Sequence, residues 1–419
     1  MRRSVRTAED RLARSIERVV RNGNCSGCAG CTLVSNRVSM NLDPEGFLRP
    51  AVEPLAAGAD LAVEARARAV FRSMCPGVRL AAPRPEGSRH DEIFGSYFSV
   101  WEASAVDPVV RDTGSSGGVL TALSAWLIET GQVEAVLGAG GSAAAPITTV
   151  PVRITSRPEA LAAAGSRYAP VGVLCGWRGE PRVGIVAKPC EVSAAAQHHS
   201  ASGAVAELPI MLSFFCAGTP SQHATDGLVQ SLGIEPGAVS RISYRGNGWP
   251  GRFTVDSGGT QAGSLSYEES WGDHLGRALQ WRCKTCVDGT GAHADISVGD
   301  FWRAGANGYP TFSAAPGTSA AIARTVRGDA ILHAAALAGV IALAPLNLAA
   351  VARVQPLQVQ RRTTMIGRLC GRLLAGKAIP VYRNYGLGRL TLAHPRANAQ
   401  ALVGTFLRTT GLRGVRRAK

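Results

Sequence analysis

Short apolar runs, separated by turns rich in glycine, dominate the middle of the chain. Those rich in Val, Ile and Leu have the length of buried strands, and they cover 133–139, 183–188, 208–216 and 295–300. Apolar residues recur at helical spacing over 118–130, and a second helix is expected over 190–199. Helical patterns that alternate with buried strands predict an α/β domain in this part of the chain.

The two ends of the chain differ from this middle part. Residues 1–23 are charged throughout, so they predict an exposed amphipathic helix and no signal peptide. The apolar stretch 334–352 contains Pro345 and Asn347, which favours a core helix or strand over a membrane span. A chain of 419 residues that is 46% hydrophobic is long enough for one or two globular domains, and we expect it to be cytoplasmic.

Cysteine spacing is the strongest chemical signal in the sequence. Cys25, Cys28 and Cys31 follow the C-x2-C-x2-C spacing of iron–sulfur ferredoxins, with small residues between them that let backbone amides approach a cluster. The usual next position holds Ser35, whereas Cys75 is followed by proline, as the fourth ferredoxin ligand is. We therefore expect these four cysteines to hold one 4Fe–4S cluster, with a four-thiolate zinc site as the alternative.

A second set of four cysteines lies further along the chain. Cys283 and Cys286 form a C-x2-C pair. Cys190 and Cys216 each lie at or just past the end of a predicted buried strand, which is where an open α/β sheet places its chemistry. These four are a second candidate set of metal ligands. The remaining two cysteines are expected to be ordinary buried thiols, and they are Cys175 and Cys370.

Glycine and serine mark a candidate ligand loop in RDTGSSGGVLTALSAWLIETG (111–131). Ser115 and Ser116 can cap the helix that follows, while Gly117 and Gly118 let the backbone come close to a ligand. Unsatisfied amides at a helix start attract phosphate, so the loop predicts a phosphate site or, alternatively, a plain capped helix.

Two later turns offer cationic and aromatic side chains. GSRYAPVG (165–172) contains Arg167 and Tyr168, and SYRGNGWPGRF (243–253) contains Arg245. Arginine, aromatic rings and glycine together suit a flat ring and its phosphates, although 243–253 taken alone favours a surface hairpin somewhat more.

Positive charge is concentrated at the C-terminal end. Residues 330–419 hold 14 Lys or Arg and no acidic residue, whereas residues 1–329 hold 31 basic and 30 acidic residues. The basic tail therefore accounts for nearly all of the net charge of +15. It is either a solvated surface or an electrostatic dock for an acidic partner. No nucleic-acid motif accompanies it, so nucleic acid is not the expected partner.

In combination, these motifs resemble the beta-subunit family of hydrogenases and dehydrogenases that reduce the deazaflavin coenzyme F420. The resemblance covers about residues 20–330 and rests on CSGCAGC…MCP, SSGGVLTAL, GSRYAPV, KPCEVSAA, FFCAGTPS, YRGNGWPG and CKTCVDG…ADISVGDFW in this order. Members bind FAD and one or more 4Fe–4S clusters, and relatives include ferredoxin-dependent reductases of chlorophyll-type pigments.

The resemblance implies roles for the candidate residues. The glycine–serine loop would lie by the FAD phosphates, through Ser116, Gly117 and Gly118, with Ser115 and Arg167 in the same cofactor site. Lys188 would be catalytic, and Tyr168 and Arg245 would lie near the flavin or its substrate. The first four cysteines would hold an outer cluster. The cluster nearest the flavin would be held by Cys190, Cys216, Cys283 and Cys286.

The predicted fold class is α/β with mixed α+β character. We expect a small ferredoxin-like iron–sulfur unit over 1–90, an α/β core that binds flavin and cluster over 91–330, and a basic C-terminal extension over 331–419. The predicted function is an iron–sulfur flavoprotein oxidoreductase. It would pass electrons between FAD, with coenzyme F420 or an organic substrate on the hydride side, and two 4Fe–4S clusters that serve a ferredoxin or another redox subunit.

Two other functions remain open. The chain could be a non-catalytic electron-transfer or adaptor subunit of a larger redox complex, with the basic tail as its docking surface. It could also be a zinc-stabilised nucleic-acid-binding module.

Overall fold

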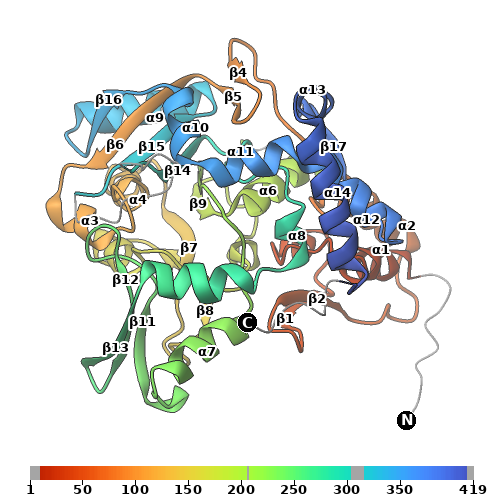
Figure 1. Ribbon diagram of the computed structural model, residues 1–419, viewed down its shortest axis with the longest axis horizontal. Coiled ribbons are helices and arrows are strands. Elements are labelled where there is room, and N and C mark those ends of the chain that lie inside the picture. Colours follow the sequence, from red (N-terminus) through yellow and green to blue (C-terminus); the bar gives the residue numbers. More distant parts are fainter. Residues whose placement is uncertain (1–9, 205–206, 303–315, 413–419) are drawn as a thin grey trace.

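An eight-stranded mixed sheet forms the centre of the computed structural model, which describes residues 10–204, 207–302 and 316–412 (Figure 1). Its strands, in the order in which they lie side by side, are β16 (Ile341–Pro345), β6 (Ser99–Ala105), β15 (Ser319–Ala323), β14 (Ile296–Asp300), β10 (Met211–Phe214), β9 (Val183–Ala187), β7 (Ala135–Gly141) and β8 (Thr149–Ile154). This sheet confirms the mixed α/β class.

The four strands expected from the sequence are the parallel centre of this sheet. β14, β10, β9 and β7 are parallel neighbours, and the outer strands pair antiparallel. Parallel strands are covered on both faces, which explains why they appear in the sequence as continuous apolar runs. The run 208–216 forms a shorter strand than expected, because β10 ends at Phe214 and the chain then turns away.

Helices cover both faces of the sheet. Val136 and Leu212 pack on one face under α4 (Val119–Glu129), α5 (Arg157–Ala162) and α9 (Val326–Leu337). Leu137 and Ile185 pack on the other face under α6 (Pro189–Ser202). Neighbouring residues of a strand point to opposite faces, so two apolar cores form, one on each side. The helices expected at 118–130 and 190–199 are confirmed as α4 and α6.

A small N-terminal unit packs beside α6. It consists of α1 (Arg11–Arg21), a 3₁₀ turn η1 (Gly30–Leu33), the hairpin β1 (Val38–Leu42) and β2 (Leu48–Val52), and α2 (Leu61–Met74). Asp10 caps α1, because its carboxylate accepts a hydrogen bond from the amide of Ala13 at 3.0 Å. The helix expected over 1–23 is thus present from residue 11 to residue 21, and residues 1–9 lie outside the described part.

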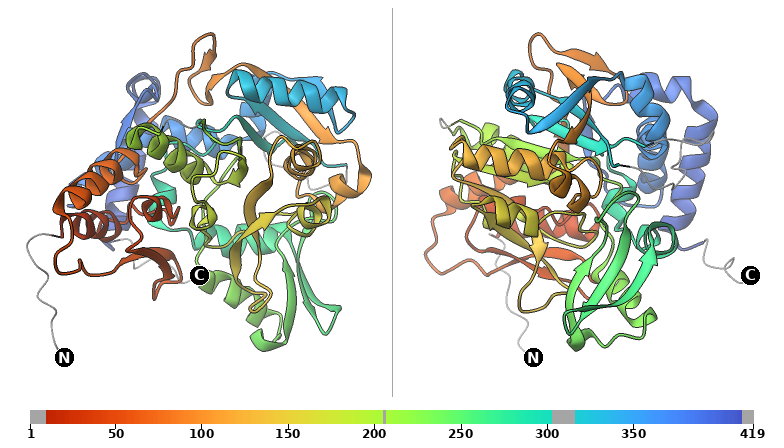
Figure 2. Two further views of the ribbon diagram at one scale, coloured as in Figure 1. Left: turned by 180° about the vertical axis from the view of Figure 1, so that it is seen from behind. Right: turned by 90° about the vertical axis from the view of Figure 1, so that its left-hand side faces the viewer.

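Smaller elements surround the sheet, and Figure 2 shows them from two further sides. The strands among them are β3 (Arg79–Ala81), β4 (Arg89–Asp91), β5 (Gly95–Tyr97), β11 (Val239–Ser243), β12 (Arg252–Ser257), β13 (Thr260–Ser266) and β17 (Val381–Arg383). The helices are α3 (Pro108–Thr113), α7 (Gln222–Ser231) and α8 (Trp281–Lys284), with shorter helical turns at η2 (Val173–Gly176), η3 (Pro236–Ala238), η4 (Glu268–His274) and η5 (Leu275–Arg277).

The C-terminal part is mostly helical and lies against the N-terminal unit (Figure 1). Its helices are α10 (Leu348–Val354), α11 (Pro356–Thr363), α12 (Met365–Leu374), α13 (Leu387–Ala393) and α14 (Pro395–Thr409). Asn24 donates to the carbonyl of Ala378 at 2.9 Å, so segments far apart in sequence meet here.

The apolar stretch 334–352 is not a single element. It contains the end of α9, the edge strand β16 and the start of α10. Because β16 belongs to the central sheet, the sheet continues beyond residue 330, and the expected boundaries at 90 and 330 stay a prediction. Within the described ranges, no helix is both long and apolar enough to span a membrane.

Candidate functional site

The N-terminal cysteine set, Cys25, Cys28, Cys31 and Cys75, surrounds a small cavity of about 20 Å³ between α1, η1 and α2. Cys75 is the residue at which α2 ends, and Pro76 turns the chain there. The sequence therefore identified four thiols that the fold brings to one place.

The surroundings of this set are apolar and tightly packed. Burial raises the pKa of the Cys28 thiol to about 11, although the backbone amide of Gly30 opposes the shift. The amide of Gly27 donates to the Cys25 sulfur at 3.4 Å. A methyl group on Gly30 would lie 2.8 Å from Ala194 of α6, so only glycine fits between this loop and the core.

The core cysteine set, Cys190, Cys216, Cys283 and Cys286, comes from three segments. Cys190 is in the first turn of α6, directly after β9, and Cys216 follows β10. Cys283 lies in α8 and Cys286 just after it. The pKa of the Cys216 thiol is raised to about 12, mainly by burial and also by the thiols of Cys283 and Cys286, while Arg361 opposes the shift.

The two cysteine sets adjoin each other at Cys190. Burial raises the pKa of the Cys190 thiol well above its ordinary value; Lys188 opposes this shift, while Cys28 of one set and Cys216 of the other both add to it. Among the described residues, no group of three or more His, Cys, Asp or Glu side chains has the spacing to hold a metal ion.

Arg282 lies between the two cysteine sets and is 1% exposed. One Nη group donates to the carbonyl of Pro76 at 3.0 Å, beside Cys75, and the other donates to the carbonyl of Thr285 at 3.1 Å, beside Cys286. This guanidinium connects the loop of one set to the loop of the other. The W-R-C-K-T-C motif contains it, but sequence reasoning passed over it.

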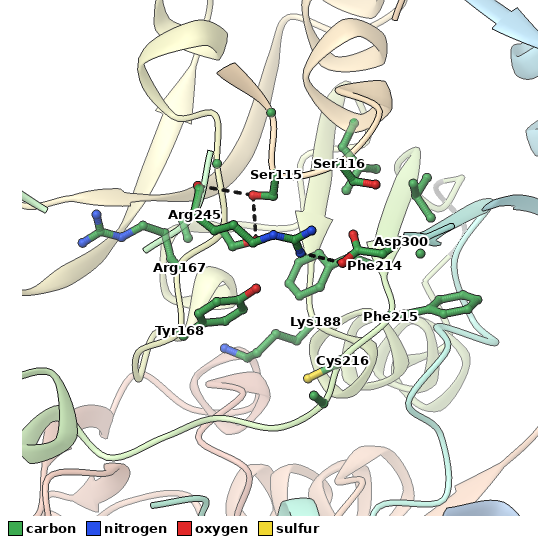
Figure 3. A pocket seen from close by; sticks show the side chains of 18 of the residues that line it. Ser115, Ser116, Arg167, Tyr168, Lys188, Phe214, Phe215, Cys216, Arg245 and Asp300 are labelled. Carbon is green, nitrogen blue, oxygen red and sulfur yellow. Dashed lines mark hydrogen bonds and ion pairs between the residues drawn. The ribbon is translucent and has the colours of Figure 1, made fainter. Parts of the chain in front are cut away.

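A cavity of about 770 Å³ opens at the carboxyl ends of the parallel strands (Figure 3). It is as large as pockets that hold drug-sized ligands, roughly 300–1,000 Å³. The wall includes residues at the ends of β9, β10 and β14, and it reaches Cys216 of the core set. Most candidate cofactor residues line it, namely Ser115, Ser116, Gly118, Arg167, Tyr168, Lys188 and Arg245.

The glycine–serine loop differs in detail from the expectation. α4 is capped by Gly118, whose φ of 70° favours glycine, and no side chain caps the helix. Ser115 and Ser116 are not caps, because Ser116 donates to the carbonyl of Thr318 at 2.6 Å and Ser115 bonds to neighbouring loops. Gly117 packs behind the pocket wall, where its amide donates to Ser319 at 3.0 Å. The start of α4, which has no side-chain cap, therefore faces the pocket.

Lys188 is paired inside the pocket wall. Its Nζ lies 3.0 Å from a carboxylate oxygen of Glu191, which is 0% exposed, and it also donates to the carbonyl of Val171. The same carboxylate accepts backbone amides of Lys188 and Val173 at 2.8 and 2.9 Å. Burial lowers the pKa of Lys188, but Glu191 and the nearby thiols outweigh it, so the pKa is raised. Lys188 is thus a fixed cation beside the cavity.

Arg245 is likewise paired, and it forms the opposite wall. Its Nη1 contacts a carboxylate oxygen of Asp300 at 2.5 Å, and its guanidinium lies 4.6 Å from the ring centre of Trp249. Arg167 differs, because its Nη1 donates to the carbonyl of Ile242 at 2.9 Å and its head points away from Tyr168 (Figure 3). Arg167 therefore shapes the wall instead of extending into the pocket.

Sequence reasoning missed the partners of these cations. Glu191 stands three residues after Lys188 at a helix start, a spacing that could have revealed it. Asp300 closes the D-I-S-V-G-D motif, which the sequence presents as a buried strand and as part of the family resemblance, with no role for this carboxylate. Spacing could not have revealed the partner of Arg245, because 55 residues separate Arg245 from Asp300.

The fold and the site together define a cysteine-rich α/β protein with a ligand pocket at the carboxyl edge of its sheet. The chain belongs to the coenzyme F420 hydrogenase/dehydrogenase beta-subunit family. The family's N-terminal region matches residues 100–175, and its C-terminal region matches residues 181–349. The resemblance proposed from the motifs is therefore confirmed.

Individual relatives are distant. The coenzyme F420 hydrogenase subunit beta of Methanothermobacter thermautotrophicus is 26% identical over 61% of this chain and 87% of its own length. The F420-dependent formate dehydrogenase 1 subunit beta of Methanococcus maripaludis is 23% identical over 48% of this chain, which spans about half of that subunit (52%). A chain of the F420-reducing nickel–iron hydrogenase complex from Methanosarcina barkeri matches with a TM-score of 0.48 and 22% identity, over 66% of this chain and 96% of that one.

Proposed function

We propose that this chain is an iron–sulfur flavoprotein oxidoreductase. In this proposal the large pocket takes FAD, the core cysteine set holds one 4Fe–4S cluster, and the N-terminal cysteine set holds a second. The observation that carries the proposal is the continuous path from pocket to thiols: Cys216 lines the pocket, and Cys190 adjoins both Cys216 and Cys28.

The residues present suit an FAD phosphate group. The first residues of α4, Gly118 to Thr121, line the pocket, and no side chain caps this helix start. The free backbone amides at a helix start bind anions, and the positive end of the helix dipole, which lies at the same place, adds to the attraction. Ser115 and Ser116 line the same wall and would complete the phosphate site.

The pocket walls suit the ring of a flavin. Trp249 and Trp302 stack at 6.1 Å, and Arg245 lies over Trp249. Lys188 enters from the opposite side as a buried cation, which would favour negative charge on a reduced ring system. A bound flavin supplies the step between hydride transfer and single electrons. Lys188 and Arg245 would position the ring and stabilise charge on it.

The donor sets suit iron–sulfur clusters. Each set offers four thiols in an apolar setting, with backbone amides directed at sulfur, such as that of Thr219, which lies 3.3 Å from the Cys283 sulfur. Hydrogen bonds from backbone amides to sulfur, and burial from solvent, both help to set the reduction potential of an iron–sulfur cluster. A ferredoxin-like N-terminal unit, a ferredoxin or other redox subunit as partner, coenzyme F420 or an organic molecule as substrate, and a cytoplasmic location all remain part of the proposal.

Anaerobic purification tests the proposal directly. The protein should be brown-yellow and should contain about eight irons and one FAD per chain. Zinc in place of iron, with no flavin, would overturn it. Reduced coenzyme F420 should bleach the flavin of the purified chain; a flavin that responds only after a partner subunit is added would identify an adaptor subunit instead of an enzyme.

A further inference from the structure

The basic tail contains arginines that are turned into the protein. Arg361 and Arg362 of α11 are 5% and 4% exposed, and Arg372 of α12 is 3% exposed. A solvated tail would leave such side chains in water, and a docking surface would present them to a partner. Both α11 and α12 lie beyond residue 349, where the match to the family ends.

Three arginines of the tail contact the loops that carry the core cysteine set. Arg361 donates to the carbonyl of Cys216 at 3.1 Å and to that of Ala217 at 2.5 Å. Arg362 donates to the carbonyl of Val287, the residue after Cys286, at 3.1 Å. The half-buried Arg368 donates to the carbonyl of Lys284 at 3.0 Å, between Cys283 and Cys286.

The packing of α11 against these loops is close. Gln358 donates to the same Cys216 carbonyl at 3.2 Å. A methyl group on Gly289 would lie 2.1 Å from the Gln358 side-chain oxygen and 3.1 Å from Arg361. The amide of Cys216 in turn donates to the carbonyl of Gly289 at 2.8 Å. Helix α11 and the two cysteine loops therefore hold one another in a single arrangement.

The charge of Arg361 is compensated in an unusual way. In the described part of the chain, no carboxylate forms an ion pair with it, and its donors go to backbone carbonyls. A buried cation without an anion is costly. The two carbonyls that it contacts belong to Cys216 and to the next residue, Ala217, so the guanidinium lies directly at the core cysteine set. The site beside Arg361 is thus suited to an anionic occupant.

We propose that Arg361 is a positioning residue of the core cysteine set, which fixes the Cys216 loop and raises the reduction potential of the cluster held there. The inference rests on the proposed function. Reduction adds one negative charge to a cluster, so a fixed positive charge nearby stabilises the reduced form more than the oxidised form. The C-terminal extension is then part of the redox site.

A redox titration of the full-length chain, purified anaerobically, tests this inference. Midpoint potentials are followed by electron paramagnetic resonance, and iron is measured in the same samples. Arg361→Gln should keep its iron and shift one cluster to a more negative potential, while the other cluster stays unchanged. Arg361→Lys retains the charge and should restore most of the potential.

Matched variants keep the test decisive. Arg353→Gln removes one charge from an exposed position on the neighbouring α10 and should leave both potentials unchanged. If Arg361→Gln does not accumulate, Arg368→Gln provides the same measurement with a smaller expected shift. If the wild type contains iron but neither substitution changes a midpoint potential, this inference is overturned and the proposed function is not. A wild type without iron would overturn the proposed function as well.

Discussion

The N-terminal cysteine set takes its four thiols from two short segments of one small unit, whereas the core cysteine set takes them from three segments of the sheet and loops. The first set is enclosed mainly by apolar side chains such as Ile16 and Phe71. The second is held from outside by arginines of α11 and α12. A site built from neighbouring residues needs little support, while a site assembled from distant strands requires additional contacts that fix its loops.

Removing one thiol from each set should have the largest effect. Cys283→Ser is expected to lose about four of about eight irons and to uncouple the flavin from the remaining cluster. Cys75→Ser should also lose about four irons but should leave the flavin in contact with the core cluster. Iron analysis and stopped-flow reduction of the flavin measure both results. Cys175 provides the control: the sequence predicted a buried thiol, but Cys175 is exposed, and Cys175→Ser should lose nothing.

If either cysteine variant keeps all of its iron, the assignment of that set is wrong. If both variants lose all of their iron, the two sets depend on each other, and the N-terminal set is not supported by its own small unit alone.

Breaking the pair beside Cys190 should have the next largest effect. Glu191→Gln leaves the Lys188 ammonium buried without its carboxylate, and loss of one partner of a buried pair costs about 3–5 kcal/mol. Thermal unfolding should show a large drop in stability. Glu134→Gln is the control, because its ion pair with Arg182 is exposed. Equal stability of the two variants would contradict the role of Glu191.

Arg282→Gln tests whether the two sets depend on each other. The substitution leaves the buried carbonyl of Pro76 without its donor, while the carbonyl of Thr285 keeps the hydroxyl of Tyr382. An unsatisfied buried group costs about 1–3 kcal/mol. We expect a lower melting temperature and partial loss of iron from both sets. Arg277→Gln removes an exposed arginine from the same region and should change neither property. Iron loss confined to one set would show that Arg282 serves that set alone.

The smallest effect concerns the N-terminal unit alone. Arg37 contacts Asp10 at 3.1 Å and Glu64 at 2.7 Å, and it ties α1 to α2. Burial raises the pKa of Asp10, but hydrogen bonds from Arg37 and from the amide of Ala13 outweigh it, so the pKa lies below its ordinary value. This stabilisation is present above the unfolded pKa and is lost as the pH falls through the folded pKa.

Asp10→Asn should therefore cost about 1 kcal/mol or less at neutral pH. The difference from the wild type should vanish towards about pH 2, where Asp10 is protonated in both states. Chemical denaturation across this pH range measures it. A difference that grows on acidification would have the wrong sign for this account.

Patterns within short segments were reliable guides to this protein. The four parallel strands, α4 and α6 followed from apolar runs and helical spacing, and Cys75 followed from its proline. What could not be predicted depends on contacts between distant segments. Arg245 meets Asp300 only because β14 and the loop after β11 converge at the sheet edge. Arg361 was counted as part of a charged tail, since charge in a sequence does not reveal which arginines are buried.

The contact between residues 22–24 and 372–378 has a kinetic consequence. The hydrogen bond from Arg372 to the carbonyl of Asn22 joins residues 350 positions apart in the chain. Contacts between such distant positions form slowly, because a long loop must close, at a cost in chain entropy, before the contacts can stabilise the fold. The segment just before Cys25 leaves the ribosome long before residues 372–378, so it gains these partners only after they have been synthesised. The N-terminal unit is therefore expected to be made before the C-terminal helices and to become rigid only once they are in place.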